Sequence, residues 1–130
     1  MSGVERFGGE PPSPFEDAYG FSRLVSAGGW VIVGGTTSVD EYGVVHGDTL
    51  YEQTRVVLEK IVRELSRVGA GVDEVVQGRI YVTDITRAED AGRAWSEVFG
   101  EVRPLMTMVE VPRLIDPRML VEVEVVAYRE

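Results

Sequence analysis

The chain has 130 residues, of which 44% are hydrophobic, and this predicts one globular domain with a core of its own. It contains no cysteine, which excludes disulfides, thiolate metal ligands and cysteine nucleophiles. The net charge is −9, and the basic residues are twelve arginines and a single lysine. An acidic protein repels phosphate backbones, so a nucleic-acid partner is disfavoured.

Residues 1–18 are rich in Gly, Pro and Glu, which predicts a flexible N-terminal arm ahead of a single domain at 19–130. The arm lacks the apolar core that a signal peptide needs. No later apolar run is long enough to span a bilayer, so we expect a cytoplasmic protein with no membrane partner.

Glycine pairs bracket the first clear strand. The run Trp30–Gly35 is continuous and β-branched, which is typical of a buried strand. Gly28 and Gly29 before it favour a hairpin turn. Gly34 and Gly35 at its end fit neither a dinucleotide-binding loop nor a P-loop. They would instead let the backbone approach a ligand or another chain closely.

The strongest helical periodicity lies between residues 50 and 68, where charged side chains take the face opposite the apolar ones. Thr49 and Glu52 have capping-box spacing, and Gly69 is a typical stop. The pattern predicts a long amphipathic helix whose inner face comprises Leu50, Thr54, Val57, Leu58, Ile61, Leu65 and Val68.

The second half predicts a strand, a shorter helix and two further strands. The strand is residues 75–84, and the helix opens with capping-box spacing at Thr86 and Glu89 and ends at Phe99, before Gly100. Residues 105–111 and 119–128 read as the last two strands. This order predicts an α+β fold, a mixed β-sheet with two helices packed on one face.

The last strand predicts what the other face of the sheet looks like. Val121, Val123 and Val125 alternate with Glu122, Glu124 and Val126, so the second face mixes carboxylates with apolar side chains. Apolar content elsewhere in the sheet favours another subunit as its cover.

Few residues suggest chemistry on their own. His46 is the only histidine, which argues against a zinc site or a catalytic triad, and we expect no metal and no cofactor. Glu122 and Glu124 are either solvated carboxylates or, if an oligomer buries them, groups with a raised pKa that could transfer protons. Arg103, before Pro104, could bind a carboxylate or simply be solvated.

Four stretches in this order resemble the RidA family, also called YjgF/YER057c/UK114 or endoribonuclease L-PSP. They are "FSRLVSAGGWVIVGGT", the long helix, "VVQGRIYVTDI" and "RPLMTMVEVPRLIDPRMLVEVEVVA". The resemblance implies a chorismate-mutase-like (YjgF-like) sandwich and a homotrimer whose open sheet faces pack together. It also implies small-molecule pockets at the subunit interfaces, where related proteins deaminate reactive enamine or imine intermediates.

The resemblance also implies a set of site residues. Glu122 matches the carboxylate that positions the hydrolytic water, and Gly92 falls where a polar helix residue often reaches into the neighbouring subunit's site. The family pattern P-x-R-x-x-V-E-V aligns with Pro104–Val111, so Met106 replaces the arginine that binds a substrate carboxylate. The implied substrate-binding residues are Phe21, Gly35, Thr36, Arg103, Met106, Thr107 and Met108.

A methionine cannot replace an arginine–carboxylate pair, so we expect poor hydrolysis of 2-imino acids unless Arg103, Arg79 or Arg93 compensates. Arg103 and Met106 are an odd number of residues apart and point to opposite faces of a strand. Three hypotheses follow: an enamine or imine deaminase, a non-catalytic metabolite-binding trimer and, ranked last, an endoribonuclease.

Overall fold

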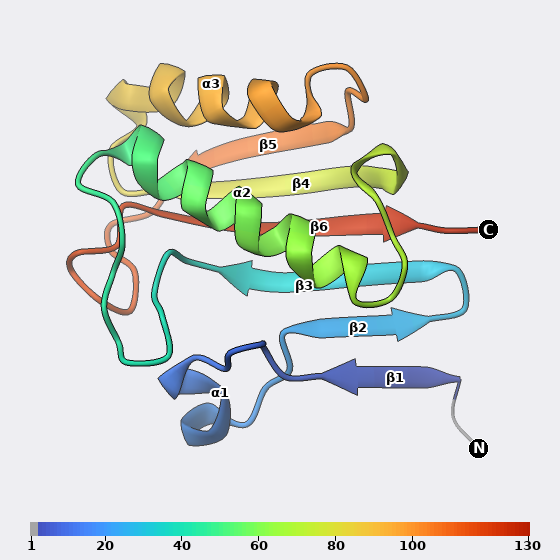
Figure 1. Cartoon of the computed structure of the whole chain (residues 1–130). Helices are drawn as coiled ribbons and strands as arrows, with labels where there is room; N and C mark the ends of the chain where they lie inside the picture. The colour runs from blue at the N-terminus through green and yellow to red at the C-terminus, as the bar shows by residue number, and fades with distance from the viewer. Residues whose placement is uncertain (1–2) are drawn as a thin grey trace.

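The computed structural model describes residues 3–130, and its centre is a six-stranded mixed sheet in the order β1-β2-β3-β6-β4-β5 (Figure 1). Neighbouring strands are antiparallel except for β4 and β5, which are parallel. The strands are β1 Val4–Phe7, β2 Leu24–Ala27, β3 Trp30–Thr36, β4 Val75–Val82, β5 Leu105–Glu110 and β6 Val121–Tyr128.

Two helices cover one face of this sheet, α2 (Leu50–Ser66) and α3 (Ala88–Phe99), as Figure 1 shows. A short helix, α1 (Pro14–Tyr19), lies at the β1 end of the sheet. Single 3₁₀ turns, η1 (Val72–Glu74) and η2 (Ile85–Arg87), precede β4 and α3. The predicted α+β fold with two helices on one face of a mixed sheet is confirmed.

The core lies between the two helices and the sheet. It is built from the inner face of α2 together with Ala91, Ala94, Trp95 and Phe99 of α3, packed on alternate residues of β3, β4 and β6. In β6 these are Val121, Val123, Val125 and Ala127, all at most 1% exposed. The valine face predicted for the last strand is therefore the face under the helices.

Among residues 3–130, no segment covers the opposite face of the sheet. Glu122 and Glu124 lie on it, and Ile32 of β3 pairs there with Val126 of β6. Ile32 is 41% exposed. At one end of this face the rings of Trp30 and Tyr128 meet edge to face at 4.9 Å, and both remain exposed. This is the mixed apolar and acidic surface that the sequence predicts.

The N-terminal residues differ from the expected arm. Val4–Phe7 pair with β2 as the edge strand β1, and Pro14–Tyr19 form a helix before the expected domain start at 19. Glu16 holds this segment together, because its carboxylate accepts hydrogen bonds from the backbone of Gly9 and Ser13. The Gly and Pro content predicted a flexible arm, because composition does not reveal a strand that pairs through its backbone.

The start of the second helix also differs from the prediction. Thr86 does not cap α3. Instead, Asp84 accepts hydrogen bonds from the backbone and hydroxyl of Thr86 and caps the 3₁₀ turn η2, after which α3 begins at Ala88. The cap of α2 is as predicted, with Thr49 Oγ1 accepting from the backbone of Glu52. Within residues 3–130, no helix has the length and apolarity needed to cross a membrane.

Candidate functional site

An open cavity of about 310 Å³ lies where β3 and β6 meet the N-terminal segment, and we call it the Glu122 cavity. The lining includes several apolar side chains and three charged ones, Arg23, Lys60 and Glu122. The lining residues are Ser13, Phe15, Tyr19, Phe21, Arg23, Gly35, Thr37, Val39, Lys60, Ile115, Met119 and Glu122.

Glu122 projects from the open face of β6 toward Gly35 of β3. The pairing of these two strands shifts between Val33 and Thr36, so the backbone of Gly34 and Gly35 bulges beside the carboxylate. A Cβ on residue 35 would overlap Oε2 of Glu122, so glycine at this position lets the carboxylate lie directly against β3. The close approach predicted for Gly34 and Gly35 is real, but the approaching group is a side chain of the same chain.

Burial raises the pKa of the Glu122 carboxyl, because a charged carboxylate loses hydration in the cavity. The nearby Arg23 guanidinium opposes this shift, and Glu124 adds to it. A raised pKa makes the protonated form of a carboxyl group more available than it is in water, and that form can donate a proton. Glu122 therefore has the environment expected of a proton-transfer group.

Arg23 forms the charged floor of the cavity. It is only 9% exposed, and its guanidinium donates to the carbonyl oxygen of Gly35 at 2.6 Å and to Thr36 Oγ1 at 2.5 Å. Thr36 Oγ1 in turn donates to the carbonyl oxygen of Gly34 at 2.8 Å. These bonds fix the bulge that holds Gly35 against Glu122. Burial lowers the pKa of Arg23, and the nearby carboxylates of Glu16, Glu64 and Glu122 oppose that shift.

Lys60 enters the same region from α2. Its Nζ donates to the carbonyl oxygens of Thr37 at 2.6 Å and Val39 at 2.8 Å, which ties the segment after β3 to the helix. Burial, with Arg23 and Arg63 nearby, lowers the pKa of Lys60 to about 8.

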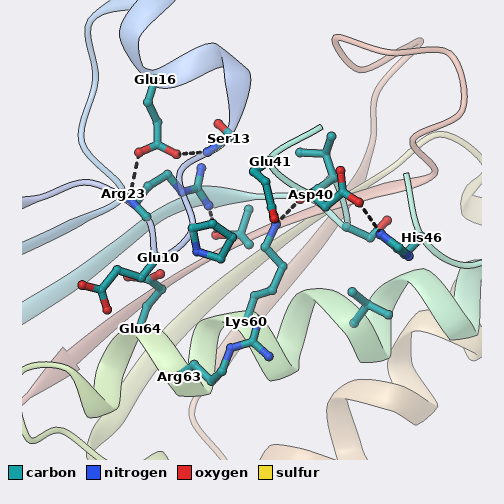
Figure 2. A pocket seen from close by; sticks show the side chains of 16 residues that line it. Glu10, Ser13, Glu16, Arg23, Asp40, Glu41, His46, Lys60, Arg63 and Glu64 are labelled. Carbon is teal, nitrogen blue, oxygen red and sulfur yellow. Dashed lines mark hydrogen bonds and ion pairs between the residues drawn. The ribbon is translucent and has the colours of Figure 1, made fainter. Parts of the chain in front are cut away.

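A second cavity, of about 220 Å³, adjoins the first, and we call it the Lys60 cavity (Figure 2). Arg23 and Lys60 line both cavities, while Arg63, Asp40 and His46 line only the second. His46 Nε2 lies 2.8 Å from Asp40 Oδ2, and this contact lowers the pKa of the aspartate. Among residues 3–130, no group of three or more His, Cys, Asp or Glu side chains could hold a metal ion.

The structure brings only part of the implied site together. Phe21, Gly35 and Glu122 line the Glu122 cavity, and the side chain of Thr36 is buried beneath it as an acceptor for Arg23. The residues of β5 and the turn before it line neither of the two cavities in the single chain; they are Arg103, Met106, Thr107 and Met108.

The two methionines of β5 lie on the helix-covered side of the sheet. Met106 and Met108 pair with Gly78 and Ile80 of β4 and share their face, which is the face packed under α3. Met108 contacts the core there, and Met106 is 38% exposed at the sheet edge. Thr107 shares the open face with Arg79.

The other arginines considered as replacements have different partners. Arg79 lies 3.4 Å from Glu124, and Arg93 packs over the ring of Tyr51 at 4.1 Å. Arg103 adopts a positive φ of 59° in the turn before β5. Gly92 lies on α3 with open space where its Cβ would be. Among residues 3–130, the cations that line the Glu122 cavity are Arg23 and Lys60, which the sequence did not predict. For Lys60, the available sequence signal was that it is the single lysine beside twelve arginines.

Comparison with known proteins agrees with this architecture. The family model described as Endoribonuclease L-PSP matches residues 13–129. A crystal structure of a YjgF/YER057c/UK114 family member from Mycobacterium tuberculosis is similar, with a TM-score of 0.86 and 42% sequence identity, covering 96% of this chain and 98% of that one.

Curated relatives lie in the same group. An uncharacterized protein of Streptomyces coelicolor is 42% identical over 120 residues, which are 90% of this chain and 87% of the relative. A 3-aminoacrylate deaminase from Acinetobacter baylyi is 34% identical over 99 residues, which are 75% of this chain and 78% of the relative.

Proposed function

Because the chain belongs to the endoribonuclease L-PSP family, also called YjgF/YER057c/UK114, we propose that it hydrolyses small enamines or imines and releases ammonia. The observation that carries this proposal is the half-buried carboxyl of Glu122, which has a raised pKa and lies in an open cavity. The activity named for the deaminase from Acinetobacter baylyi is of the same class.

One carboxyl group can serve each proton transfer of this reaction. Protonated Glu122 gives its proton to the β-carbon of an enamine, and the electron pair on nitrogen forms the C=N bond of an iminium ion. The resulting carboxylate then takes a proton from water as the water oxygen attacks the iminium carbon. Glu122 then protonates the amino group, and its carboxylate takes the hydroxyl proton as the carbinolamine collapses to a carbonyl compound and ammonia, with no oxidant or reductant involved.

The lining of the cavity limits the substrate. Phe21, Ile115 and Met119 favour an apolar side chain, whereas Arg23 and Lys60 are the cations available to an anionic group. Arg23 already donates two hydrogen bonds within the protein, so it is a weaker clamp than a free arginine. We therefore propose small substrates whose recognition depends less on a carboxylate than on apolar contact.

We further propose that the protein is a homotrimer with its ligand sites between subunits. Support comes from the uncovered sheet face and from β5, an edge strand with exposed Leu105 and Val109. A long, apolar edge strand is ordinarily covered by another chain. In such an assembly, β5 and its open-face residue Thr107 would be covered by the neighbouring subunit.

The test is a coupled assay in which an amine oxidase generates neutral imines in situ, or an amino-acid oxidase generates 2-imino acids, and release of the carbonyl compound is followed. We expect the protein to accelerate release above the solvent rate, and Glu122→Gln to reduce the acceleration by about 10² to 10⁴-fold. Glu97→Gln is the matched control, because Glu97 accepts from Tyr51, lies outside both cavities and is not among the groups that shift the pKa of Glu122. No acceleration across apolar and anionic substrates would refute the proposal.

A second candidate is a metabolite-binding protein without catalysis, favoured by the methionine at position 106. It predicts saturable binding of an apolar metabolite that Glu122→Gln leaves intact, with no turnover by either protein.

Endoribonuclease activity ranks last, since the net charge is −9 and His46, the one histidine, is hydrogen-bonded to Asp40. RNA cleavage that persists in a Glu122→Gln, Arg23→Gln double variant would indicate a contaminating nuclease.

A further inference from the structure

Lys60 is the only lysine in the chain, and its amine lies inside a cavity rather than on the surface. Figure 2 shows the side chain rising from α2 toward the segment that carries Asp40 and Glu41, with Arg63 beside it. The Lys60 cavity is open to solvent on one side and has room for a few heavy atoms at about 220 Å³. A small molecule in this cavity would therefore meet the amine.

The amine has two hydrogen-bond acceptors and, among residues 3–130, no ion pair. The acceptors are the carbonyl oxygens of Thr37 and Val39. Glu16 and Glu64 are the carboxylates that favour its positive charge, but both have other partners. Glu16 accepts from two backbone groups, and Glu64 Oε2 lies 2.6 Å from Arg67. Nothing in the described chain neutralises Lys60 directly.

Neutral and protonated amines differ in what they need from this site. A neutral amine has two N–H groups, which match the two carbonyl acceptors and leave the nitrogen lone pair free. An ammonium has a third N–H and also meets the repulsion of Arg23 and Arg63. With a pKa of about 8, about one tenth of the amine is neutral at pH 7. Desolvation beside other cations is a recognised way to make a lysine nucleophilic.

We propose that Lys60 condenses reversibly with a small carbonyl compound that carries an anionic group, forming a Schiff base in the Lys60 cavity. The Nζ lone pair attacks the carbonyl carbon, and the C=O π pair moves to oxygen, which takes a proton. The carbinolamine then loses water to give C=N, so amine and carbonyl yield imine and water without an oxidant or reductant. The protonated imine keeps one N–H for Thr37 or Val39.

The preference for an anionic compound follows from Arg63. Its guanidinium lines the Lys60 cavity and, among residues 3–130, forms no ion pair. Carboxylates also line the cavity, but four of them have other partners: Glu10 and Glu64 pair with Arg67, Glu16 accepts from two backbone groups, and Asp40 contacts His46. Arg63 is therefore the guanidinium to which a carboxylate on the carbonyl compound would bind. This site is distinct from the site of the proposed hydrolysis, since Glu122 lines only the other cavity.

The experiment uses glyoxylate as the anionic probe and propionaldehyde as a neutral one, each followed by borohydride reduction and peptide mass spectrometry. The chain's α-amine serves as an internal control in every sample. We expect a reduced adduct on Lys60 that saturates with glyoxylate and forms at least tenfold more than with propionaldehyde. Labelling of the α-amine without labelling of Lys60 would overturn the proposal, as would equal, unsaturable labelling by both probes.

Two variants separate this site from general amine reactivity. Arg63→Gln should reduce the preference for glyoxylate at least threefold, whereas Arg55→Gln, on the same helix but paired with Glu97, should not. Glu122→Gln should carry the same Lys60 adduct while losing the proposed hydrolysis. Loss of the adduct in that variant would place the reaction in the Glu122 cavity and overturn the assignment made here.

Discussion

The carboxylate of Glu122 occupies the space in which a side chain at position 35 would begin. The position of Glu122 on β6 thus depends on the glycine on β3, which lies in the irregular pairing between Val33 and Thr36. Because Arg23 bonds the carbonyl oxygen of Gly35, the charge at the floor of the cavity and the room for Glu122 depend on the same few atoms.

Gly35→Ala should force Glu122 away from its position, because the new methyl group overlaps the carboxylate. We expect little loss of stability, because the overlapped atoms are the end of a flexible side chain that can move aside, together with a large loss of deaminase activity. Denaturant unfolding and the coupled assay measure the two effects. Unchanged activity would show that Glu122 does not need this position.

Gly92→Ala is the matched control for that substitution. Nothing lies within 4 Å of where its Cβ would be, and Gly92 is inside α3. Replacing glycine with alanine in a helix interior should raise stability by about 0.5–1 kcal/mol. A destabilised Gly92→Ala protein would indicate that this helix face is covered by a neighbouring subunit.

Glu122→Gln should make the protein more stable at neutral pH while it abolishes hydrolysis. Burial raises the pKa of Glu122 in the folded protein, so the unfolded chain holds the charged form more easily. The native protein therefore bears a free-energy penalty above the folded pKa, and this penalty disappears as pH falls through that pKa to 4.5, the ordinary pKa of a glutamate carboxyl. Unfolding from pH 4 to 8 should show the advantage of the variant shrinking toward acid pH.

Arg23→Met should destabilise the protein by about 1–3 kcal/mol, because the buried acceptors Gly35 O and Thr36 Oγ1 lose their donor. The pKa of Lys60 should also rise above its value of about 8, since Arg23 is one of the groups that lower it. NMR titration of the single lysine reports that change directly. Arg87→Gln, at an exposed pair with Asp90, should change stability by less than about 0.5 kcal/mol.

Ile32→Asp tests the proposed trimer, because Ile32 lies at the centre of the uncovered sheet face beside Val126. A charge there should separate the subunits, and sedimentation at micromolar concentration should show a trimer becoming a monomer. Val44→Asp changes an equally exposed side chain on a loop and should leave the trimer intact. A wild-type monomer at that concentration would refute the trimer.

Periodicity predicted the elements that form the core, because the pattern of α2 and the alternation in β6 follow directly from burial on one face. It did not reveal β1, since an edge strand is held by backbone hydrogen bonds and needs no apolar pattern. It also missed Arg23, whose burial depends on two acceptors supplied by the irregular end of β3. Contacts between segments far apart in the chain leave no local signal.

The place of β6 in the sheet has a consequence for biosynthesis. It follows every other strand in the chain, yet it lies between β3 and β4 and pairs with both. Until a ribosome has made it, β1–β3 and β4–β5 are two half-sheets that share no strand pairing, and contacts between such distant segments form slowly. Until then, β3 and β4 each have an unpaired edge in the nascent chain. The strand that pairs with both, β6, also carries Glu122. Sheet closure and the formation of the cavity are a single event.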